Sequence, residues 1–238
     1  MDDGRVANFK YSWLYLLLGQ DIQEINQFQK DHINYAHFKT EVTSLGPGQR
    51  SVIWTQACPL NCYRCISPEW QAPVIANVET VSNLTGKLYF PRIEGLTISG
   101  GEPFLQTTGL VSLIRELREK VPFIDIICYS GFTLEQLTEP KLASLLDSQE
   151  LLKEMDILID GPYIESLNDD SGLRGSSNQR VHILKPNPKY EGFNFESNPR
   201  IIEYLPKLEL RDGNLINTEE FAGIPSIQFT RLWRRENG

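Results

Sequence analysis

Residues 51–65 read SVIWTQACPLNCYRC, an apolar segment followed at once by three cysteines. The segment 51–56 is typical of a β-strand. Cys58, Cys62 and Cys65 follow it on one loop with the spacing C-x3-C-x2-C. Thiolates are the ligands that iron–sulfur clusters require, and three of them on one loop can hold three corners of a cubane. The fourth iron then stays open for a substrate or cofactor, so the segment predicts a [4Fe–4S] site.

Two other uses of these cysteines stay open at this point. A structural zinc site needs four protein ligands. The fourth would have to be one of these residues: Cys128, His32, His37 or His182. Cys128 stands in a predicted buried strand, where a cysteine usually behaves as a small apolar side chain. A redox pair Cys62–Cys65 is also conceivable, but it leaves Cys58 unexplained.

Beyond the loop, strands and helices alternate. The predicted strands cover residues 51–56, 95–98, 123–129, 155–160 and 181–184. Helix patterns lie between them, and Leu110, Leu113, Ile114 and Leu117 mark one buried helix face. A weak helix is expected near 77–87, a helix cap at Thr133 and a helix break at Pro140. Such alternation predicts an α/β fold, an open, partial βα barrel of about five to six parallel strands.

The chain is divided into three predicted regions. Residues 1–40 are expected to be an N-terminal helical extension, residues 41–190 the core, and residues 191–238 a C-terminal extension. Asp212-Gly213 predicts a hairpin between 207–211 and 214–217.

Composition excludes several classes of function. The net charge of −8 argues against a nucleic-acid-binding protein, which normally has a basic face. The longest apolar run, 13–18, is too short to cross a bilayer and has no signal-peptide features. No membrane association and a cytoplasmic location are therefore expected, and four cysteines in such a chain do not predict disulfides.

Glycines and polar residues recur where the predicted strands end. Gly100-Gly101-Glu102-Pro103 follows the strand 95–98, and two glycines there let the backbone approach a ligand closely. Ser130 follows the strand 123–129, and Asp160 ends the strand 155–160. Each of these also fits an ordinary turn. A carboxylate at the carboxyl-terminal rim of a parallel barrel is nevertheless a reasonable site residue.

Together these stretches resemble the radical S-adenosylmethionine (SAM) superfamily. The cysteine loop and the following Ser67-Pro68-Glu69-Trp70 carry the resemblance, as does Gly46-Pro47-Gly48 with Arg50 before the strand. The subgroup it resembles comprises the activating enzymes of anaerobic ribonucleoside-triphosphate reductase and of pyruvate formate-lyase. Its SAM motif is matched by Gly100–Glu102. Further matches are Tyr129–Thr133, Asp160–Tyr163 and Leu173–Arg180, over residues 33–185 in all and more weakly over 208–225.

The resemblance implies both ligands and contacts. The cysteines would hold the cluster, and Glu102 would accept hydrogen bonds from the amino group of SAM. The implied SAM-facing residues are Arg64, Ile66, Gly100, Gly101, Glu102, Ser130 and Asp160, while Asn178 and Arg180 would contact SAM or a partner's radical loop. Arg64 and Ile66 depart from the family pattern, which often has an aromatic residue before the third cysteine and a different residue after it.

The resemblance also implies the chemistry. One electron from a flavodoxin- or ferredoxin-type donor would pass through the [4Fe–4S] cluster and split SAM into methionine and a 5′-deoxyadenosyl radical. That radical would take a hydrogen atom from a glycine of a partner enzyme. Modification of a peptide or small molecule is an alternative, and a non-catalytic iron–sulfur or zinc-binding module is another.

Overall fold

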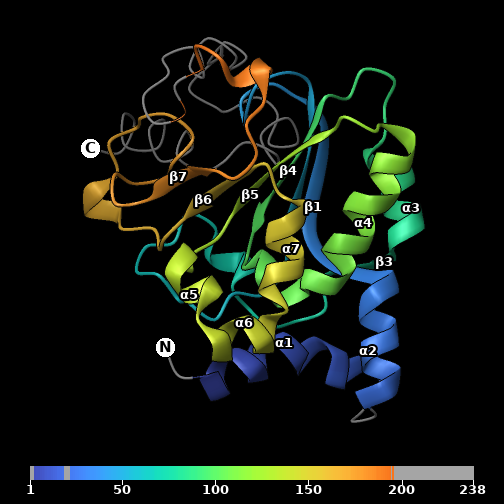
Figure 1. Cartoon of the computed structure of the whole chain (residues 1–238). Coiled ribbons are helices and arrows are strands. Elements are labelled where there is room, and N and C mark those ends of the chain that lie inside the picture. The colour runs from blue at the N-terminus through green and yellow to red at the C-terminus, as the bar shows by residue number, and fades with distance from the viewer. Residues whose placement is uncertain (1–2, 19–21, 194, 196–238) are drawn as a thin grey trace, which may run out of the picture.

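A computed structural model describes residues 3–18, 22–193 and 195 of the chain. Its strands form a seven-stranded sheet with the order β3-β1-β2-β4-β5-β6-β7 (Figure 1). They are β1 (His32–Val42), β2 (Arg50–Thr55), β3 (Asn77–Thr80), β4 (Gly95–Gly100), β5 (Asp125–Tyr129), β6 (Ile157–Asp160) and β7 (Arg180–Ile183). Since β3 and β7 lie at opposite edges, the sheet is open and does not close into a barrel.

The centre of the sheet is parallel, as the alternating strands and helices predict. β2 pairs with β4, β4 with β5, and β5 with β6, in each case parallel. All residues of β2 and β6 are buried, as expected for parallel strands covered on both faces. The strand predicted to begin at Phe123 begins at Asp125, and the Phe123 side chain is 93% exposed.

The outer strands are antiparallel. β1 pairs with β2 and β3 in this way, and β7 pairs with β6. The predicted total of about five to six parallel strands is therefore too high, and the strand expected at 181–184 has the opposite direction. Parallel strands need a crossover connection, usually an α-helix. The connection from β6 to β7 contains only the short 3-10 helix η3 (Glu165–Leu167), so the chain returns antiparallel.

The N-terminal region is only partly helical. α1 (Asp3–Leu18) and α2 (Ile22–Asp31) agree with the predicted helical extension, but β1 begins at His32 and crosses the predicted boundary at residue 40. Likewise, the helix expected near 77–87 divides into β3 and α3 (Val81–Leu88). The hairpin predicted at 207–217 lies outside the described residues.

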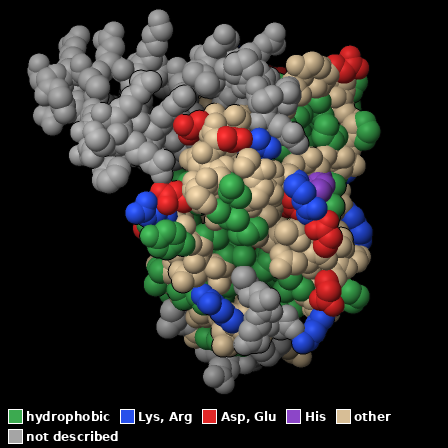
Figure 2. Space-filling model, turned by 90° about the vertical axis from the view of Figure 1, so that its left-hand side faces the viewer, with side chains coloured by type: hydrophobic (Ala, Val, Ile, Leu, Met, Phe, Trp, Pro, Cys, Tyr) green, Lys and Arg blue, Asp and Glu red, His purple; other side chains and the backbone are tan. Residues whose placement is uncertain are grey.

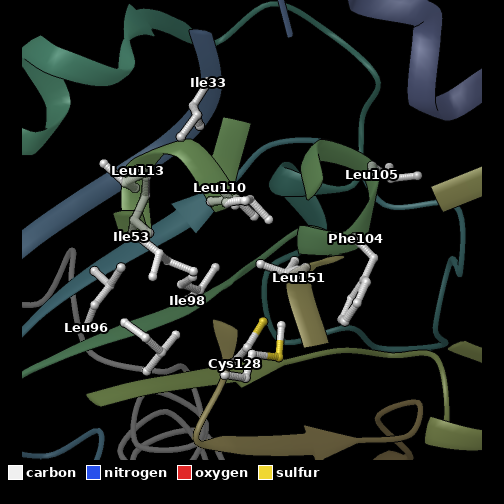
Figure 3. Packing of buried hydrophobic residues seen from close by; sticks show 14 of the residues in the cluster. Ile33, Ile53, Leu96, Ile98, Phe104, Leu105, Leu110, Leu113, Cys128 and Leu151 are labelled. Atoms are coloured by element: carbon white, nitrogen blue, oxygen red, sulfur yellow. The ribbon is translucent and has the colours of Figure 1, made fainter. Parts of the chain in front are cut away.

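Helices cover one face of the central sheet. α3, α4 (Thr107–Lys120) and α7 (Ser148–Glu154) lie along it, and α1 and α2 lie at one end of the helical layer (Figure 1). The four apolar residues predicted for one face of α4 are all fully buried. Figure 3 shows Leu110 and Leu113 beside Ile53 and Ile98 of the sheet. Each such side chain contributes about 1.5–3 kcal/mol by its burial.

The helix cap and the helix break predicted between β5 and β6 are both found in the structure. Thr133 caps α5 (Leu134–Thr138) through a capping box with Gln136, and Pro140 begins α6 (Pro140–Leu146). The cap and the break fall where the sequence predicts them, because a proline has no N–H to continue α5. No helix in the described part of the chain is long and apolar enough to span a membrane.

Candidate cluster and cofactor site

A cavity of about 150 Å³ lies where the four parallel strands end at their carboxyl termini. Its wall comes from the segments that follow β2, β4, β5 and β6, so the sheet brings together residues that are far apart in sequence. The lining residues that follow β2 and β4 include Cys58, Leu60, Cys62, Cys65, Ile66, Trp70, Gln71, Gly100 and Gly101. Those that follow β5 and β6 include Ser130, Gly131, Gly161, Tyr163, Leu173 and Gln179. Ligands of open α/β sheets bind in this position, outside the carboxyl ends of the strands.

The cysteine loop is held at both of its ends. The backbone N–H of Cys58 donates to the carbonyl oxygen of Gln71 at 3.0 Å, and that of Ala57 donates to Trp70 at 2.9 Å. Between these anchors, Ala57, Asn61 and Arg64 have positive φ angles of 78°, 50° and 50°. Non-glycine residues in this region of φ/ψ space cost free energy, and they gather at functional sites. The loop thus bends around the cavity and directs three cysteines to one wall.

The three thiols are surrounded by N–H donors. Burial raises the pKa of Cys58, Cys62 and Cys65, so without a cation nearby these groups stay protonated near neutral pH. Backbone N–H groups oppose the effect of burial, namely those of Leu60 at Cys58, Tyr163 at Cys62 and Ser67 at Cys65. N–H donors to sulfur are a normal feature of cluster sites, and a bound metal deprotonates the thiols outright. The donor set therefore fits an iron–sulfur cluster.

A zinc site is disfavoured by the same geometry. Among the described residues, the cavity lining has no His, Asp or Glu beside the three cysteines, so the fourth ligand of a structural zinc site is missing there. Cys128 is fully buried in the main core and lies beside its strand partner Ile98 (Figure 3). Cys58 and the other cysteines are free thiols. Three thiols without a fourth protein ligand suit a cluster that keeps one iron open better than a tetrahedral structural zinc ion.

Gly100 and Gly101 line the cavity, but their small size serves the packing of the cluster loop. A Cβ atom on Gly101 would stand 2.2 Å from the carbonyl oxygen of Ala57, and one on Gly100 would stand 2.4 Å from the nitrogen of Thr55. Gly100 also has a φ of +103°. The glycines thus let the end of β4 lie against the chain that leads from β2 into the cysteines.

The chain after the third cysteine is fixed by buried amides that the sequence analysis missed. The Asn34 side chain donates to the carbonyl of Val74 at 2.8 Å and accepts from the N–H of Ala76 at 3.0 Å. Gln56 donates to the carbonyl of Ala72 at 2.8 Å, and Gln106 donates to the carbonyl of Asn34 at 2.7 Å. Segments 72–76, β1 and β2 are thereby joined behind the cavity.

Comparison with known proteins agrees with this geometry. The family described as 4Fe-4S single cluster domain matches residues 44–182, which is more than half of the chain. The chain belongs to this family.

Proteins similar to this chain include two reductase-activating proteins and a pyruvate formate-lyase-activating enzyme. The anaerobic ribonucleoside-triphosphate reductase-activating protein of Enterobacteria phage T4 is 30% identical over 141 residues, which cover 57% of this chain and 85% of the relative. That of Haemophilus influenzae is 29% identical over 162 residues, covering 64% and 99%. The pyruvate formate-lyase-activating enzyme of Staphylococcus epidermidis is 32% identical over 148 residues, covering 59% and 56%. These matches confirm the resemblance to the radical SAM activating-enzyme group.

Glu102, one of the implied SAM-facing residues, lies directly behind residues that line the cavity. It is fully buried and is not among the cavity-lining residues. Its carboxylate accepts hydrogen bonds from the Ser130 hydroxyl at 2.9 Å and the Gly131 N–H at 2.9 Å, and from the Phe104 N–H. Burial raises the pKa of Glu102 to about 7. In the structure the carboxyl joins the ends of β4 and β5, and Ser130 and Gly131 face the cavity in its place.

Asp160 and Arg180 also lie outside the cavity wall. Asp160 is fully buried and accepts from the backbone N–H of Leu134 at 2.6 Å and from Arg180 at 2.5 Å. Burial acts to raise the pKa of Asp160, but the hydrogen bonds from Arg180 and Leu134 lower it overall. Arg180 also pairs with Glu135 at the surface. These contacts join α5 to β6 and β7, a structural arrangement that the turn interpretation of Asp160 did not include.

In the stretch 173–180, the residue that lines the cavity is Gln179, which the sequence analysis did not single out. Its amide oxygen accepts from the Gly175 N–H at 2.7 Å, and its amide nitrogen donates to Gly161 at 2.8 Å. Asn178 instead donates to Pro162 at 2.8 Å and is absent from the lining. The polar pattern marks this loop as a candidate, but it does not say which side chain turns inward.

The two departures from the family pattern have different positions. Ile66 lines the cavity, whereas Arg64 points outward and forms a two-fold hydrogen bond with Glu165 at 2.9 and 3.1 Å. Tyr63, next to it, is 78% exposed. Arg64 therefore ties the cluster loop to the segment after β6 from the outside and leaves the cavity wall unchanged.

Proposed function

We propose that this chain is an activating enzyme that cleaves SAM at a [4Fe–4S] cluster on Cys58, Cys62 and Cys65. These cysteines would hold the cluster, which would supply one-electron reduction of SAM to methionine and a 5′-deoxyadenosyl radical, with the electron coming from a flavodoxin- or ferredoxin-type donor. The proposed hydrogen donor is a backbone glycine of a separate enzyme. It would become a glycyl radical, with 5′-deoxyadenosine as the other product.

The observation that carries this proposal is the convergence of the cysteines and the glycine motif on one cavity. Cys58, Cys62, Cys65, Gly100 and Gly101 all line it, although they come from two different strand ends. A cluster held by three thiolates would keep one iron open, and the amino-acid part of SAM would bind there. A metal-binding module without catalytic function would not need the second cavity wall that Gly100 and Gly101 form beside the cysteines.

The chain's own residues would position the substrate and exclude water. The carbonyl groups at Gly100 and Gly101 and the hydroxyl oxygen of Ser130 would accept from the amino group of SAM, since the Gly101 N–H and the Ser130 hydroxyl proton already bond to Thr55 and Glu102. Glu102 would act through Ser130 and Gly131, because it holds both of them in place. Apolar side chains such as Trp54, Ile66 and Leu173 form much of the remaining wall and shield a radical from solvent.

A protein partner is supported by the names of the relatives, each of which activates another enzyme. Loops near the cavity carry exposed apolar side chains, namely Tyr63, Ile164 and Leu167. Figure 2 shows one face of the molecule on which hydrophobic side chains gather in the middle, with charges of both signs around them. Such a mixed surface suits protein contact better than nucleic acid, in keeping with the net charge of −8. We place the enzyme in the cytoplasm, free of membranes, because an exposed cubane needs a reducing compartment.

The decisive experiment measures SAM cleavage under anaerobic conditions. The iron-reconstituted chain is mixed with SAM and dithionite, and 5′-deoxyadenosine is followed by chromatography. Cys62→Ala should lose the product, whereas Cys128→Ala, which alters a buried thiol of the core, should keep it. A chain that holds about four irons but makes no 5′-deoxyadenosine would contradict the proposal. With a candidate glycyl-radical enzyme added, the doublet signal of a glycyl radical in its EPR spectrum tests the acceptor separately.

A further inference from the structure

Gln71 stands between two of the cysteines in space. It directly follows the 3-10 helix η1 (Pro68–Trp70), and its carbonyl oxygen accepts from the backbone N–H of Cys58 at 3.0 Å. Its side chain lines the same cavity as Cys65. The backbone bond fixes where this side chain begins, so the amide reaches the cavity from an anchored position.

The amide nitrogen of Gln71 differs from those of the other glutamines around the site. Gln56, Gln106 and Gln179 each donate to a backbone carbonyl at 2.7–2.8 Å. The Gln71 Nε2 atom is buried and has no hydrogen-bond partner among the described residues. Buried polar groups are nearly always hydrogen-bonded, so an exception in a ligand cavity points to a group that binds there.

The surroundings of this nitrogen indicate a sulfur as its acceptor. Cys65 lines the same cavity as Gln71, and the Gln71 side-chain amide approaches the Cys65 sulfur as a donor. The Gln71 amide is thus directed at the Cys65 sulfur, and it meets a stronger acceptor once that sulfur is a cluster-bound thiolate.

We propose that Gln71 is a positioning residue that donates an N–H···S hydrogen bond to Cys65 of the bound cluster and thereby raises the reduction potential of that cluster. This inference rests on the proposed function. Reduction adds one electron, whose charge spreads over the sulfurs, so a donor to sulfur stabilises the reduced state more than the oxidised state. The effect eases the electron transfer that must precede SAM cleavage.

The test is an EPR-monitored redox titration of the full, iron-reconstituted chain, with and without SAM. Gln71→Met keeps the length of the side chain and removes the donor. Gln27→Met makes the same change at an exposed glutamine of α2 that does not line the cavity. We expect the midpoint potential of Gln71→Met to shift to a more negative value both with and without SAM, and that of Gln27→Met to stay at the wild-type value.

Each other outcome overturns the inference. If Gln71→Met and the wild type share one potential, the amide does not reach the cluster. If the shift occurs only when SAM is present, the amide serves SAM and not the sulfur. If Gln71→Met does not take up iron, Gln71→Leu, which also removes the donor and adds no charge, must show the negative shift. A wild-type chain without any cluster would instead refute the proposed function itself.

Discussion

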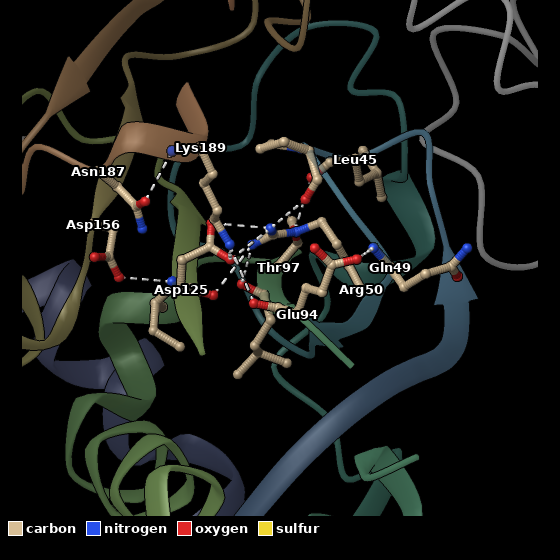
Figure 4. Close-up of polar contacts among 12 residues, drawn as sticks. Leu45, Gln49, Arg50, Glu94, Thr97, Asp125, Asp156, Asn187 and Lys189 are labelled. Atoms are coloured by element: carbon tan, nitrogen blue, oxygen red, sulfur yellow. Dashed lines mark hydrogen bonds and ion pairs between the residues drawn. The ribbon is translucent and has the colours of Figure 1, made fainter. Parts of the chain in front are cut away.

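The two ends of the parallel strands are built in opposite ways. At their amino-terminal ends, Arg50, Gly95 and Asp125 begin β2, β4 and β5, and they lie side by side in register across the sheet. Arg50 donates to both carboxylate oxygens of Asp125 at 2.9 and 3.0 Å, and the two side chains are 0% and 1% exposed. Lys189 lies on the other side of Asp125 (Figure 4), and the Tyr190 hydroxyl donates to the same carboxylate at 2.9 Å. This end is closed by charge pairing.

The carboxyl-terminal ends are open. There the corresponding positions carry cysteines, glycines and a serine, and they enclose a cavity. Of the two buried carboxyl groups at this end, Glu102 is held by neutral donors alone, whereas Asp160 is paired with Arg180 behind the cavity wall. Positive φ angles occur at Ala57 and Gly100 at this end. At the amino-terminal end, Gly46 has a φ of +134°.

The contrast shows how stability and function share one sheet. The Gly46-Pro47-Gly48 turn with Arg50, which the resemblance places before the cluster loop, lies at the closed end and supports the sheet. Arg50 Nη1 donates to the carbonyl of Pro47 at 3.0 Å, and its Nε donates to Thr97 at 2.8 Å. Rigidity at the closed end permits strained and unpaired groups at the open end.

Removal of Arg50 should break the closed end and have the largest effect. Arg50→Met leaves the Asp125 carboxylate buried beside Lys189 and Tyr190 only. Loss of one partner of a buried ion pair costs about 3–5 kcal/mol, so the free energy of unfolding should fall by that amount. Urea denaturation monitored by circular dichroism measures it.

The matched control is the exposed pair of the open end. Arg64→Met removes a guanidinium with the same two-fold geometry toward Glu165, but its side chain is 62% exposed. The midpoint of denaturation should not change measurably, because water screens such pairs. Equal losses in the two variants would mean that burial does not distinguish the two ends.

A methyl group on Gly101 should disturb the open end by a smaller amount. The added Cβ would overlap the Ala57 carbonyl, which is backbone and cannot rotate away. We expect Gly101→Ala to lower the free energy of unfolding by about 2 kcal/mol and to reduce the iron content after reconstitution. Gly86→Ala is the control, since nothing lies within 4 Å of a Cβ there. That helix variant should gain about 0.5–1 kcal/mol, and an unchanged iron content in Gly101→Ala would contradict the packing argument.

The sequence could predict the open end better than the closed end. The spacing of Cys58, Cys62 and Cys65 defines their chemistry without any three-dimensional information, and apolar runs place the loop at a strand end. The same local patterns correctly predict the buried face of α4. They fail for β1, because its pairing with β2 and β3 is decided by distant segments and not by its own residues.

The direction of side chains at the strand ends also could not be predicted from the sequence. Sequence puts Glu102 and Asp160 at strand ends, but it does not say whether they face the cavity or the protein interior. The partners that decide this, Ser130 for Glu102 and Arg180 for Asp160, are 28 and 20 positions away. Gln71 and Gln179 were missed for the same reason, since a glutamine has no positional signature in a loop.

The two ends of the strands should also differ in how their stability depends on pH, which is the smallest effect that we expect. Burial raises the pKa of Glu102 to about 7, above the value of about 4.3 in an unfolded chain. The folded state therefore holds this proton more tightly. The contribution to stability is present in full below about pH 4.3 and is lost as the pH rises through 7.

From pH 6 to pH 8, the linkage amounts to a loss of about 1 kcal/mol in the cluster-free protein. Glu102→Gln keeps the shape of the side chain and its acceptor oxygen but cannot ionise. We expect the difference in unfolding free energy between this variant and the wild type to move by that amount, in favour of the variant, over the same interval. At the closed end, Arg50 and Lys189 lie beside Asp125, so the buried charge of that carboxylate is paired, unlike the charge of an ionised Glu102. If the unfolding free energies of the wild type and Glu102→Gln change in parallel with pH, the Glu102 carboxyl group ionises in the folded protein as easily as it does in water.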